Sequence, residues 1–212
     1  MTNDIFIIGA GGFGREVQWI IERINEKNNK WNLLGYIDDG IKEGTFINGY
    51  NVLGGTDYLI NYSTEVCVVC AVGNPKVREK IISKLVSNNK ILFPNIIDPD
   101  VKMSKYIKMG KGNIICAGNI LTVNIEISDF CIINLDCTIG HDDEINSYVT
   151  IYPSVNVSGN VKISKCTELG TGSQVIQGIT IGEYVTVGAG AVVVNEIPNN
   201  CVAVGCPAKP IR

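Results

Sequence analysis

The chain has 212 residues, 45% of them apolar and 18% charged, with a formal net charge of −3 and a pI near 5.2. That composition suffices for a hydrophobic core in one large domain or two small ones. It offers no basic stripe that could neutralise phosphates, so we expect no nucleic-acid partner. The beginning, MTNDIFIIGAGG, shows no basic leader, and no run of about eighteen apolar residues follows. We therefore expect a cytoplasmic protein with no membrane partner.

The first predicted element is a short strand in DIFIIGAGGFG, residues 4–14, which runs into a glycine turn. Apolar residues at helical spacing follow in residues 14–27, namely Val17, Ile20, Ile21 and Ile24. A second strand is expected in WNLLGYIDD, residues 31–39. A strand, a helix and a further strand in this order indicate a parallel sheet with helices on its faces.

The next elements continue this alternation. EVCVVCAVG, residues 65–73, predicts a buried strand. In the helix that follows, Asn74 is suited to the N-cap and Pro75 to the first turn, and one face is apolar. That face consists of Ile81, Ile82, Leu85 and Val86. We interpret residues 1–93 as a Rossmann-like α/β domain.

Eight cysteines would suit a disulfide framework in a secreted protein, but without a secretory signal we interpret them as small hydrophobic residues. Cys67 and Cys70 form a C-x-x-C pattern inside the predicted strand. Neither a second cysteine pair nor a histidine accompanies it, so we assign it a structural role rather than a metal or redox role.

From residue 94 to residue 212 the hydrophobic period becomes six. Every sixth residue from Ile97 to Val193 is apolar, at seventeen consecutive sites. With 45% apolar residues, such a run has a chance on the order of one in a million. The pattern predicts a solenoid of five to six triangular coils, each built from three short strands, with the repeat side chains inside. Residues n and n+18 should then lie one above the other, about 4.8 Å apart.

The six-residue rhythm, SGNVKIS, IGEYVTVGAGAVV and the ending VAVGCPAKPIR resemble the left-handed parallel β-helix acyltransferases. With GAGGFGREV and YIDD, the chain resembles bacterial sugar acetyltransferases that join a nucleotide-sugar-binding domain to such a helix. The resemblance implies acetyl-CoA as co-substrate, no metal, a homotrimer with sites between subunits, and a UDP-linked 4-amino sugar as acceptor.

His141 is the only histidine and stands in NLDCTIGHDDEI. Acetyl transfer needs a base for the attacking group and a donor for the oxyanion, and an imidazole suits the first task. His141 follows the repeat residue Ile139 by two positions, so we expect it at a corner of the coil. The spacing of 18 places Gly159 over the imidazole. The alternative is a surface histidine without a role.

The resemblance also implies a role for each of these residues and their neighbours. It makes His141 the base, Asp142 the carboxylate that orients it, and Gly159 the oxyanion donor. Asn134 would contact the acceptor sugar, although it could equally be a ladder asparagine. Further cofactor contacts are implied for Thr150, where relatives often carry a second histidine, and for Thr171 and Ala189, which are 18 residues apart.

GAGGFG, residues 9–14, satisfies G-x-G-x-x-G between a strand and a helix. By itself this motif indicates a dinucleotide site, but the domain is short for two mononucleotide halves. We therefore expect the loop to hold the diphosphate of a sugar nucleotide. By resemblance the nucleotide contacts are Gly11, Gly12, Phe13, Asp38, Asp39 and Gly73.

Two alternatives to N-acetylation stay open in the sequence, O-acetylation and a scaffold role, and a third, metal-dependent hydrolysis, is set aside. O-acetylation of a sialic acid or related sugar would use the same base. A zinc hydrolase on this fold would need three histidines, and the chain has one. A trimeric nucleotide-binding scaffold without catalysis would not depend on His141.

Overall fold

The computed structural model describes residues 2–211 and contains two compact units, Met1–Pro99 and Asp100–Arg212. The division lies six residues beyond the boundary expected from the change of period. No helix within residues 2–211 is both long and apolar enough to cross a bilayer.

The first unit contains a parallel sheet of four strands in the order β2-β1-β5-β6. The pairing of β1 with both β2 and β5 places the three predicted strands side by side. A short hairpin, β3 and β4, and the helix α2 were not expected from the sequence. The bounds are β1 Asn3–Ile8, α1 Gly12–Asn28, β2 Trp31–Ile37, β3 Phe46–Ile47, β4 Tyr50–Asn51, α2 Thr56–Ile60, β5 Val66–Cys70, α3 Pro75–Leu85, β6 Ile91–Leu92 and β7 Ile96–Ile97.

The two predicted helices form where the pattern placed them. Val17, Ile20 and Ile21 of α1 are buried, and the Asn74 side chain caps α3 by accepting the Val77 N–H at 3.0 Å. One part of the α3 prediction is wrong. Val86, the C-cap residue, is 55% exposed, so its side chain is not part of the buried face of the helix.

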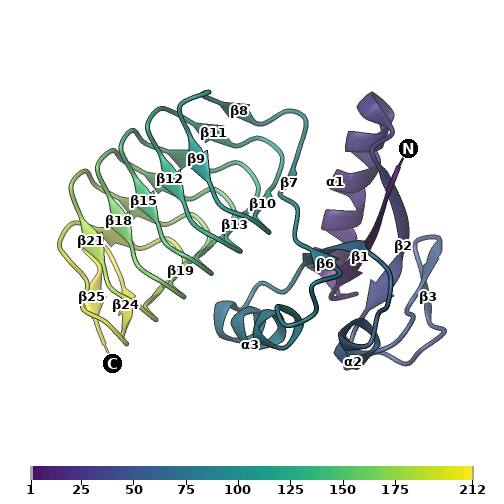
Figure 1. Ribbon diagram of the computed structural model, residues 1–212. Helices are drawn as coiled ribbons and strands as arrows, with labels where there is room; N and C mark the ends of the chain where they lie inside the picture. Colours follow the sequence, from purple (N-terminus) through teal and green to yellow (C-terminus); the bar gives the residue numbers. More distant parts are fainter. Residues whose placement is uncertain (1, 212) are drawn as a thin grey trace. The chain divides into compact units, whose positions relative to one another are not determined.

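The second unit is a parallel β-helix whose two-residue strands each end on a repeat residue (Figure 1). The strands are β8 Lys102–Met103, β9 Lys108–Met109, β10 Ile114–Ile115, β11 Ile120–Leu121, β12 Glu126–Ile127, β13 Ile132–Ile133, β14 Thr138–Ile139, β15 Glu144–Ile145, β16 Thr150–Ile151, β17 Asn156–Val157, β18 Lys162–Ile163, β19 Glu168–Leu169, β20 Gln174–Val175, β21 Thr180–Ile181, β22 Thr186–Val187 and β23 Val192–Val193. The antiparallel pair β24 Val202–Val204 and β25 Lys209–Pro210 ends the chain.

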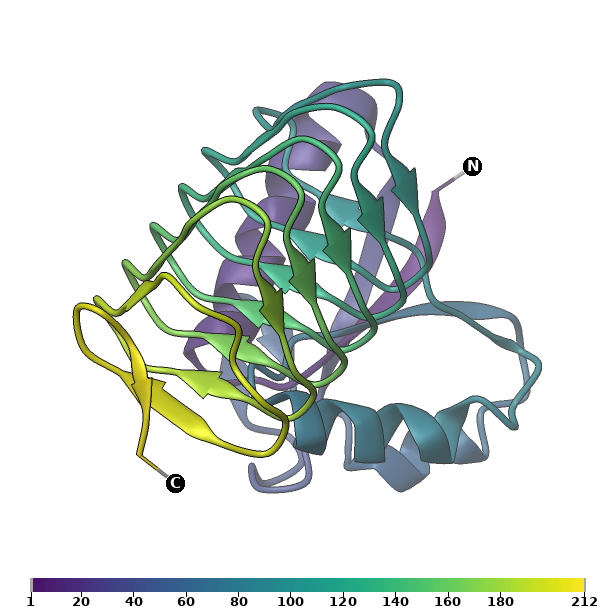
Figure 2. The same ribbon diagram turned by 90° about the vertical axis from the view of Figure 1, so that its left-hand side faces the viewer.

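Three sheets form the walls of this helix, and Figure 2 shows the coils stacked one behind another. Ile139 of β14 pairs with Val157 of β17, 18 residues later, which confirms the predicted register. We name the walls by their strands: the β14 wall is β23-β20-β17-β14-β11-β8, the β15 wall is β21-β18-β15-β12-β9, and the β13 wall includes β19, β16, β13 and β10.

The repeat residues from Ile115 to Val193 fill the interior, as predicted. Met103 differs, because its side chain is 40% exposed. It stands in the first coil of this unit, where no complete coil lies beneath it in the stack. All eight cysteines are free thiols, and burial raises the pKa of Cys70 to about 12, as expected for an inert buried thiol.

Candidate active site

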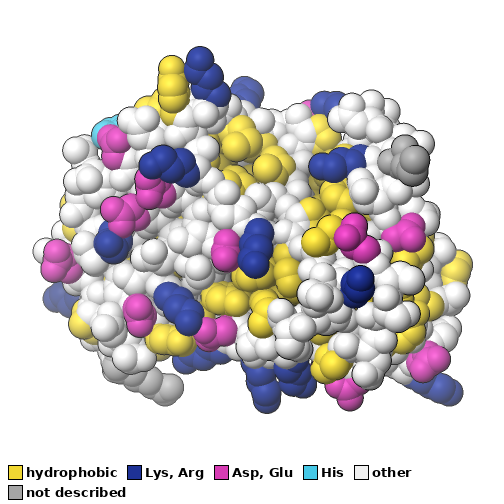
Figure 3. Space-filling model, viewed as in Figure 1, with side chains coloured by type: hydrophobic (Ala, Val, Ile, Leu, Met, Phe, Trp, Pro, Cys, Tyr) yellow, Lys and Arg dark blue, Asp and Glu magenta, His cyan; other side chains and the backbone are white. Residues whose placement is uncertain are grey.

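His141 lies in the turn between β14 and β15, outside the packed interior. Its side chain is 54% exposed, and the histidine atoms are visible on the face drawn in Figure 3. The backbone of this turn is hydrogen-bonded to the coils on both sides. The His141 carbonyl accepts the Asn160 N–H at 2.8 Å, and the Asp142 N–H donates to the Val123 carbonyl at 3.1 Å. The stacked coils therefore hold the backbone of His141 in place, while its imidazole is exposed.

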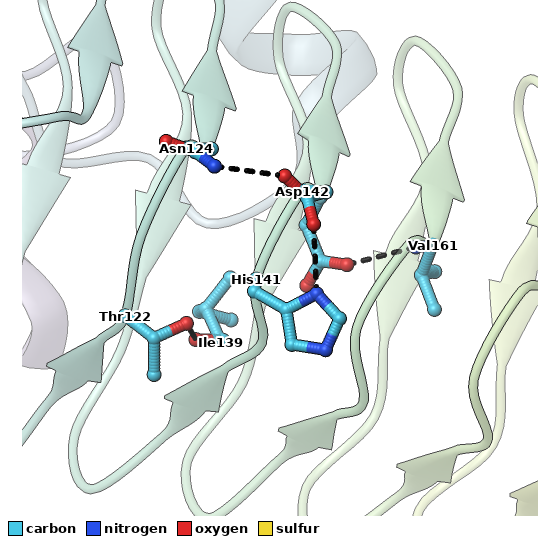
Figure 4. Close-up of polar contacts among 7 residues, drawn as sticks. Thr122, Asn124, Ile139, His141, Asp142 and Val161 are labelled. Carbon is cyan, nitrogen blue, oxygen red and sulfur yellow. Dashed lines mark hydrogen bonds and ion pairs between the residues drawn. The ribbon is translucent and has the colours of Figure 1, made fainter.

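Asp142 reaches the imidazole, although neighbours on a strand normally point apart. It has a φ of 60°, in the left-handed region that aspartate tolerates better than most residues. This bend turns the carboxylate back, and its Oδ2 lies 2.8 Å from His141 Nδ1 (Figure 4). Because a carboxylate only accepts hydrogen bonds, Nδ1 carries the proton and Nε2 keeps its lone pair.

Asn124 completes a chain of three side chains that we did not anticipate. Its Nδ2 donates to the other Asp142 oxygen, Oδ1, at 3.1 Å (Figure 4). The hydrogen bonds from His141 and then from Asn124 lower the pKa of Asp142, so the carboxylate is ionised at neutral pH. The spacing of 18 residues between Asn124 and Asp142 is the signal that could have revealed this contact.

Gly159 lies over the imidazole, as the 18-residue spacing predicted. A Cβ at this position would come within 2.5 Å of His141 Nε2, which is closer than atoms can pack. The Gly159 N–H donates to no acceptor within residues 2–211. Nε2 thus faces a residue without a side chain and with an unused backbone donor.

Asp143 follows the pair but points into the helix, where it is fully buried. Its Oδ1 accepts the Val161 N–H at 2.8 Å, the bond that ends on Val161 in Figure 4. Burial raises the pKa of Asp143 to about 7, while the N–H groups of Val161 and Gly140 and the charge of His141 oppose this shift. The sequence pattern alone did not indicate a role for Asp143.

The other predicted helix residues lie at a different corner. Asn134, Thr171 and Ala189 stand between strands of the β13 wall and the β14 wall, whereas His141 stands between the β14 and β15 walls. Thr171 and Ala189 are both exposed and form one column, in which the Gly190 N–H donates to the Thr171 carbonyl at 2.9 Å. The structure therefore does not bring this column together with His141 within one chain.

Asn134 and Thr150 are less accessible than the resemblance implied. The Asn134 Oδ1 accepts the N–H of its neighbour Leu135 at 2.8 Å. Thr150, on β16, is 1% exposed, so its hydroxyl reaches a bound molecule only if the covering residues move. Both assignments stay predictions.

The first unit has a pocket at the carboxyl ends of its parallel strands, where open α/β sheets bind ligands. Its lining includes Asp38 and Asp39 after β2, Gly9 after β1 and Val72 after β5. The remaining predicted nucleotide contacts do not line this pocket: Gly11 and Gly12 are exposed at the start of α1, Phe13 is half-buried beside them, and Gly73 is half-buried in the loop after β5.

Both pocket aspartates are hydrogen-bonded within the unit. The Asp38 Oδ2 accepts the Ala10 N–H of the glycine loop at 2.8 Å, and its Oδ1 accepts the Gly40 N–H at 2.8 Å. Asp39 accepts the N–H and the hydroxyl of Thr56, and the Thr56 N–H holds the pKa of Asp39 below its usual value. These contacts shape the loops around the pocket, and direct contact with a nucleotide stays a prediction.

Known proteins match the first unit alone and also most of the chain. The PglD N-terminal domain family matches residues 4–85. The chain is 28% identical over 178 residues to the GDP-perosamine N-acetyltransferase of Escherichia coli O157:H7, covering 82% of this chain and 78% of that protein.

Two solved structures match over the full length. The acetyltransferase domain of PglB from Neisseria gonorrhoeae, in complex with acetyl coenzyme A, is 30% identical with a TM-score of 0.90, covering 100% of both chains. PerB from Caulobacter crescentus, in complex with CoA and GDP-perosamine, is 26% identical with a TM-score of 0.89, covering 100% of this chain and 99% of PerB.

The fold and these full-length matches thus define an acyltransferase of the hexapeptide-repeat β-helix class. Within this class the chain belongs to the acetyltransferases that carry a PglD N-terminal domain. The resemblance identified in the sequence is confirmed.

Proposed function

We propose that this protein transfers the acetyl group of acetyl-CoA to the amino group of a nucleotide-linked amino sugar. The observation that carries the proposal is the arrangement at His141: Asp142 fixes Nδ1, and Nε2 faces the unused N–H of Gly159. A proton acceptor and an oxyanion donor side by side are what acyl transfer to an amine requires.

The reaction follows from these groups. The neutral amine attacks the thioester carbonyl, and His141 Nε2 takes the proton that the amine loses. The Gly159 N–H donates to the oxyanion that forms on the acetyl carbonyl. Collapse of this intermediate breaks the carbon–sulfur bond, and the proton on His141 passes to the departing thiolate. The ionised Asp142 stabilises the imidazolium while it exists.

The acceptor is proposed to be a nucleoside-diphosphate 4-amino sugar held by the first unit. The glycine loop before α1 would place its N–H groups at the diphosphate, and the pocket beside Asp38 and Asp39 would hold the nucleoside. The resemblance favours UDP, whereas the E. coli and C. crescentus relatives are named for GDP-perosamine. The nucleotide is therefore the first variable to test.

The test incubates the protein with acetyl-CoA and a panel of UDP-, dTDP- and GDP-linked amino sugars, with sialic acid as the hydroxyl acceptor. Thiol release measures turnover, the mass of the product shows that one acetyl group was added, and its NMR spectrum locates that group on nitrogen or oxygen. We expect turnover on an amine, fastest for one nucleotide. Turnover on the hydroxyl acceptor alone would replace N-acetylation by O-acetylation, and no turnover on any acceptor would contradict the proposal.

A further inference from the structure

The interior of the β-helix contains a second series of positions, two residues before each repeat residue, and several polar side chains of this series tie adjacent coils together. Asn113 accepts the Cys131 N–H at 2.7 Å and Asn119 accepts the Cys137 N–H at 2.9 Å. The Thr167 hydroxyl accepts the Val185 N–H at 3.2 Å. Neutral side chains therefore suffice for this task.

Asp143 occupies the same position and makes the same bond to Val161. It is the one carboxylic acid in this series between residues 113 and 197, where the other members are neutral amides, hydroxyls, thiols or apolar side chains. It is fully buried, and its Oδ2 has no hydrogen-bond partner within residues 2–211. A buried ionisable group with an unpaired oxygen lowers the stability of the fold. The hydrogen bond to the Val161 N–H does not require an acid, because a neutral side chain could accept it.

Asp143 stands two residues after His141, in the same turn between β14 and β15. Its position therefore suggests a relation to the proposed base. The charge of protonated His141 acts on Asp143 and opposes the effect of burial, whereas the charge of Asp142 acts in the same direction as burial. Such an interaction is mutual, so ionised Asp143 favours the imidazolium by the same amount. Buried charges are also screened less by solvent than exposed ones.

We propose that Asp143 is a positioning residue that stabilises the imidazolium of His141 from inside the helix, as a second carboxylate in addition to the exposed Asp142. The inference rests on the proposed function in taking His141 as the base. The turn of His141 thus carries two acids in different environments, Asp142 exposed to solvent and Asp143 buried in the core.

The other groups around the imidazole do not supply this charge. From the coil on one side come Val123 and Asn124, and from the coil on the other side come Gly159 and Asn160, all of them neutral. The acid next along the chain, Glu144, is exposed and pairs with Lys162 at 2.8 Å.

The test uses the fact that His141 is the only histidine of the chain. The NMR signal of its ring, in protein with labelled histidine, reports the titration of the base without assignment. Asp143→Asn keeps an oxygen for the Val161 N–H and removes the ionisation. We expect the titration midpoint of the ring to fall by at least about half a pH unit, and the acid limb of kcat/KM to move with it.

Two further variants make the result decisive. Asp143→Thr copies the side chain that the chain itself uses at position 167, so it provides a second folded variant in which the same fall is expected. Glu144→Gln removes a neighbouring exposed carboxylate, and its midpoint should stay within about 0.2 pH units because solvent screens that charge.

Unchanged midpoints in both Asp143 variants would reduce Asp143 to a structural residue and overturn the inference. The ring titration is measured without substrate, so it stands apart from the acetyl-transfer assay. A shifted ring titration with an unshifted kcat/KM profile would also overturn the inference, because His141 would then not be the group that limits turnover. Absence of any turnover would instead contradict the proposed function.

Discussion

At the scale of single residues, the site depends on two turn residues in the left-handed region. Asn124 and Asp142 occupy equivalent turn positions in successive coils, with φ values of 58° and 60°. Asparagine and aspartate adopt this conformation at modest cost and also carry groups that hydrogen-bond locally. The same two residues thus close the turns and orient His141.

Replacing Asn124 with glycine tests this orientation, because glycine keeps the turn and removes only the amide. We expect kcat/KM for acetyl transfer to fall about tenfold, as one hydrogen bond to the Asp142 carboxylate is lost. Steady-state kinetics measure the fall. Asn200→Gly, at another left-handed position with a φ of 57°, is the matched control and should stay near wild type.

Asp143 also predicts how stability depends on pH. Its pKa is raised from 3.8 to about 7 in the folded chain, so between these values the folded state binds more protons than the unfolded state. The stability contributed by protonated Asp143 is therefore lost as pH rises from about 4 to 7. Relative to wild type, Asp143→Asn should gain about 1 to 3 kcal/mol between pH 4.5 and pH 8.

Thermal or urea unfolding at the two pH values measures this gain. Comparing each protein with itself across pH removes the fixed cost of placing an amide in the core. A difference between wild type and Asp143→Asn that is the same at both pH values would show that Asp143 has an ordinary pKa.

At the scale of elements, close stacking of the coils decides which residues fit beside the base. A Cβ on Gly140 would come within 2.5 Å of the Gly159 backbone nitrogen. Backbone atoms cannot move aside as a flexible side chain can, so neighbouring coils must separate. The same spacing brings Gly159 to the imidazole.

Gly140→Ala should therefore destabilise the β-helix by about 1 to 3 kcal/mol, the usual cost of overpacking. The free energy of unfolding from urea titration checks this value. Ser158→Ala changes the same column one coil later without adding volume, and it should be nearly neutral. A Gly140→Ala protein as stable as wild type would mean that the coils are less tightly stacked than the structure shows.

Much of this architecture could be predicted from the sequence, because a strict period of six fixes both the strands and their register. The same register predicted Gly159 over His141 and could have predicted Asn124 under Asp142. The register did not identify Asp143. The left-handed φ of Asp142, which the sequence does not show, sets Asp142 toward solvent and Asp143 toward the core. The hairpin Phe46–Asn51 and the helix Thr56–Ile60 are too short to show a period.

At the scale of the whole molecule, the proposed base and the predicted cofactor contacts lie at two different corners of the β-helix. This separation predicts active sites that are shared between chains. His141 lies at one corner, whereas Thr171 and Ala189 lie at another. In a cyclic trimer, one chain could present its base to the cofactor column of the next. Light scattering should then give a mass three times the 23.0 kDa of the chain.

Mixing two inactive variants tests the sharing. We expect His141→Ala and Ala189→Trp to be inactive alone, the first without a base and the second with a blocked column. Coexpressed in equal amounts, they should regain about one quarter of the wild-type activity, because a quarter of the shared sites combine two intact halves. A mixture of His141→Ala with the double variant is the control, and it should stay inactive. No recovery in the first mixture would place the site within one chain.

The most direct test of the account compares wild type and His141→Ala in acetyl transfer to the best acceptor of the panel. We expect kcat to fall by two orders of magnitude or more, while the affinity for the nucleotide sugar, measured by calorimetry, changes little. Turnover by His141→Ala at the wild-type rate would contradict it, because the imidazole fixed by Asp142 would then have no part in the chemistry.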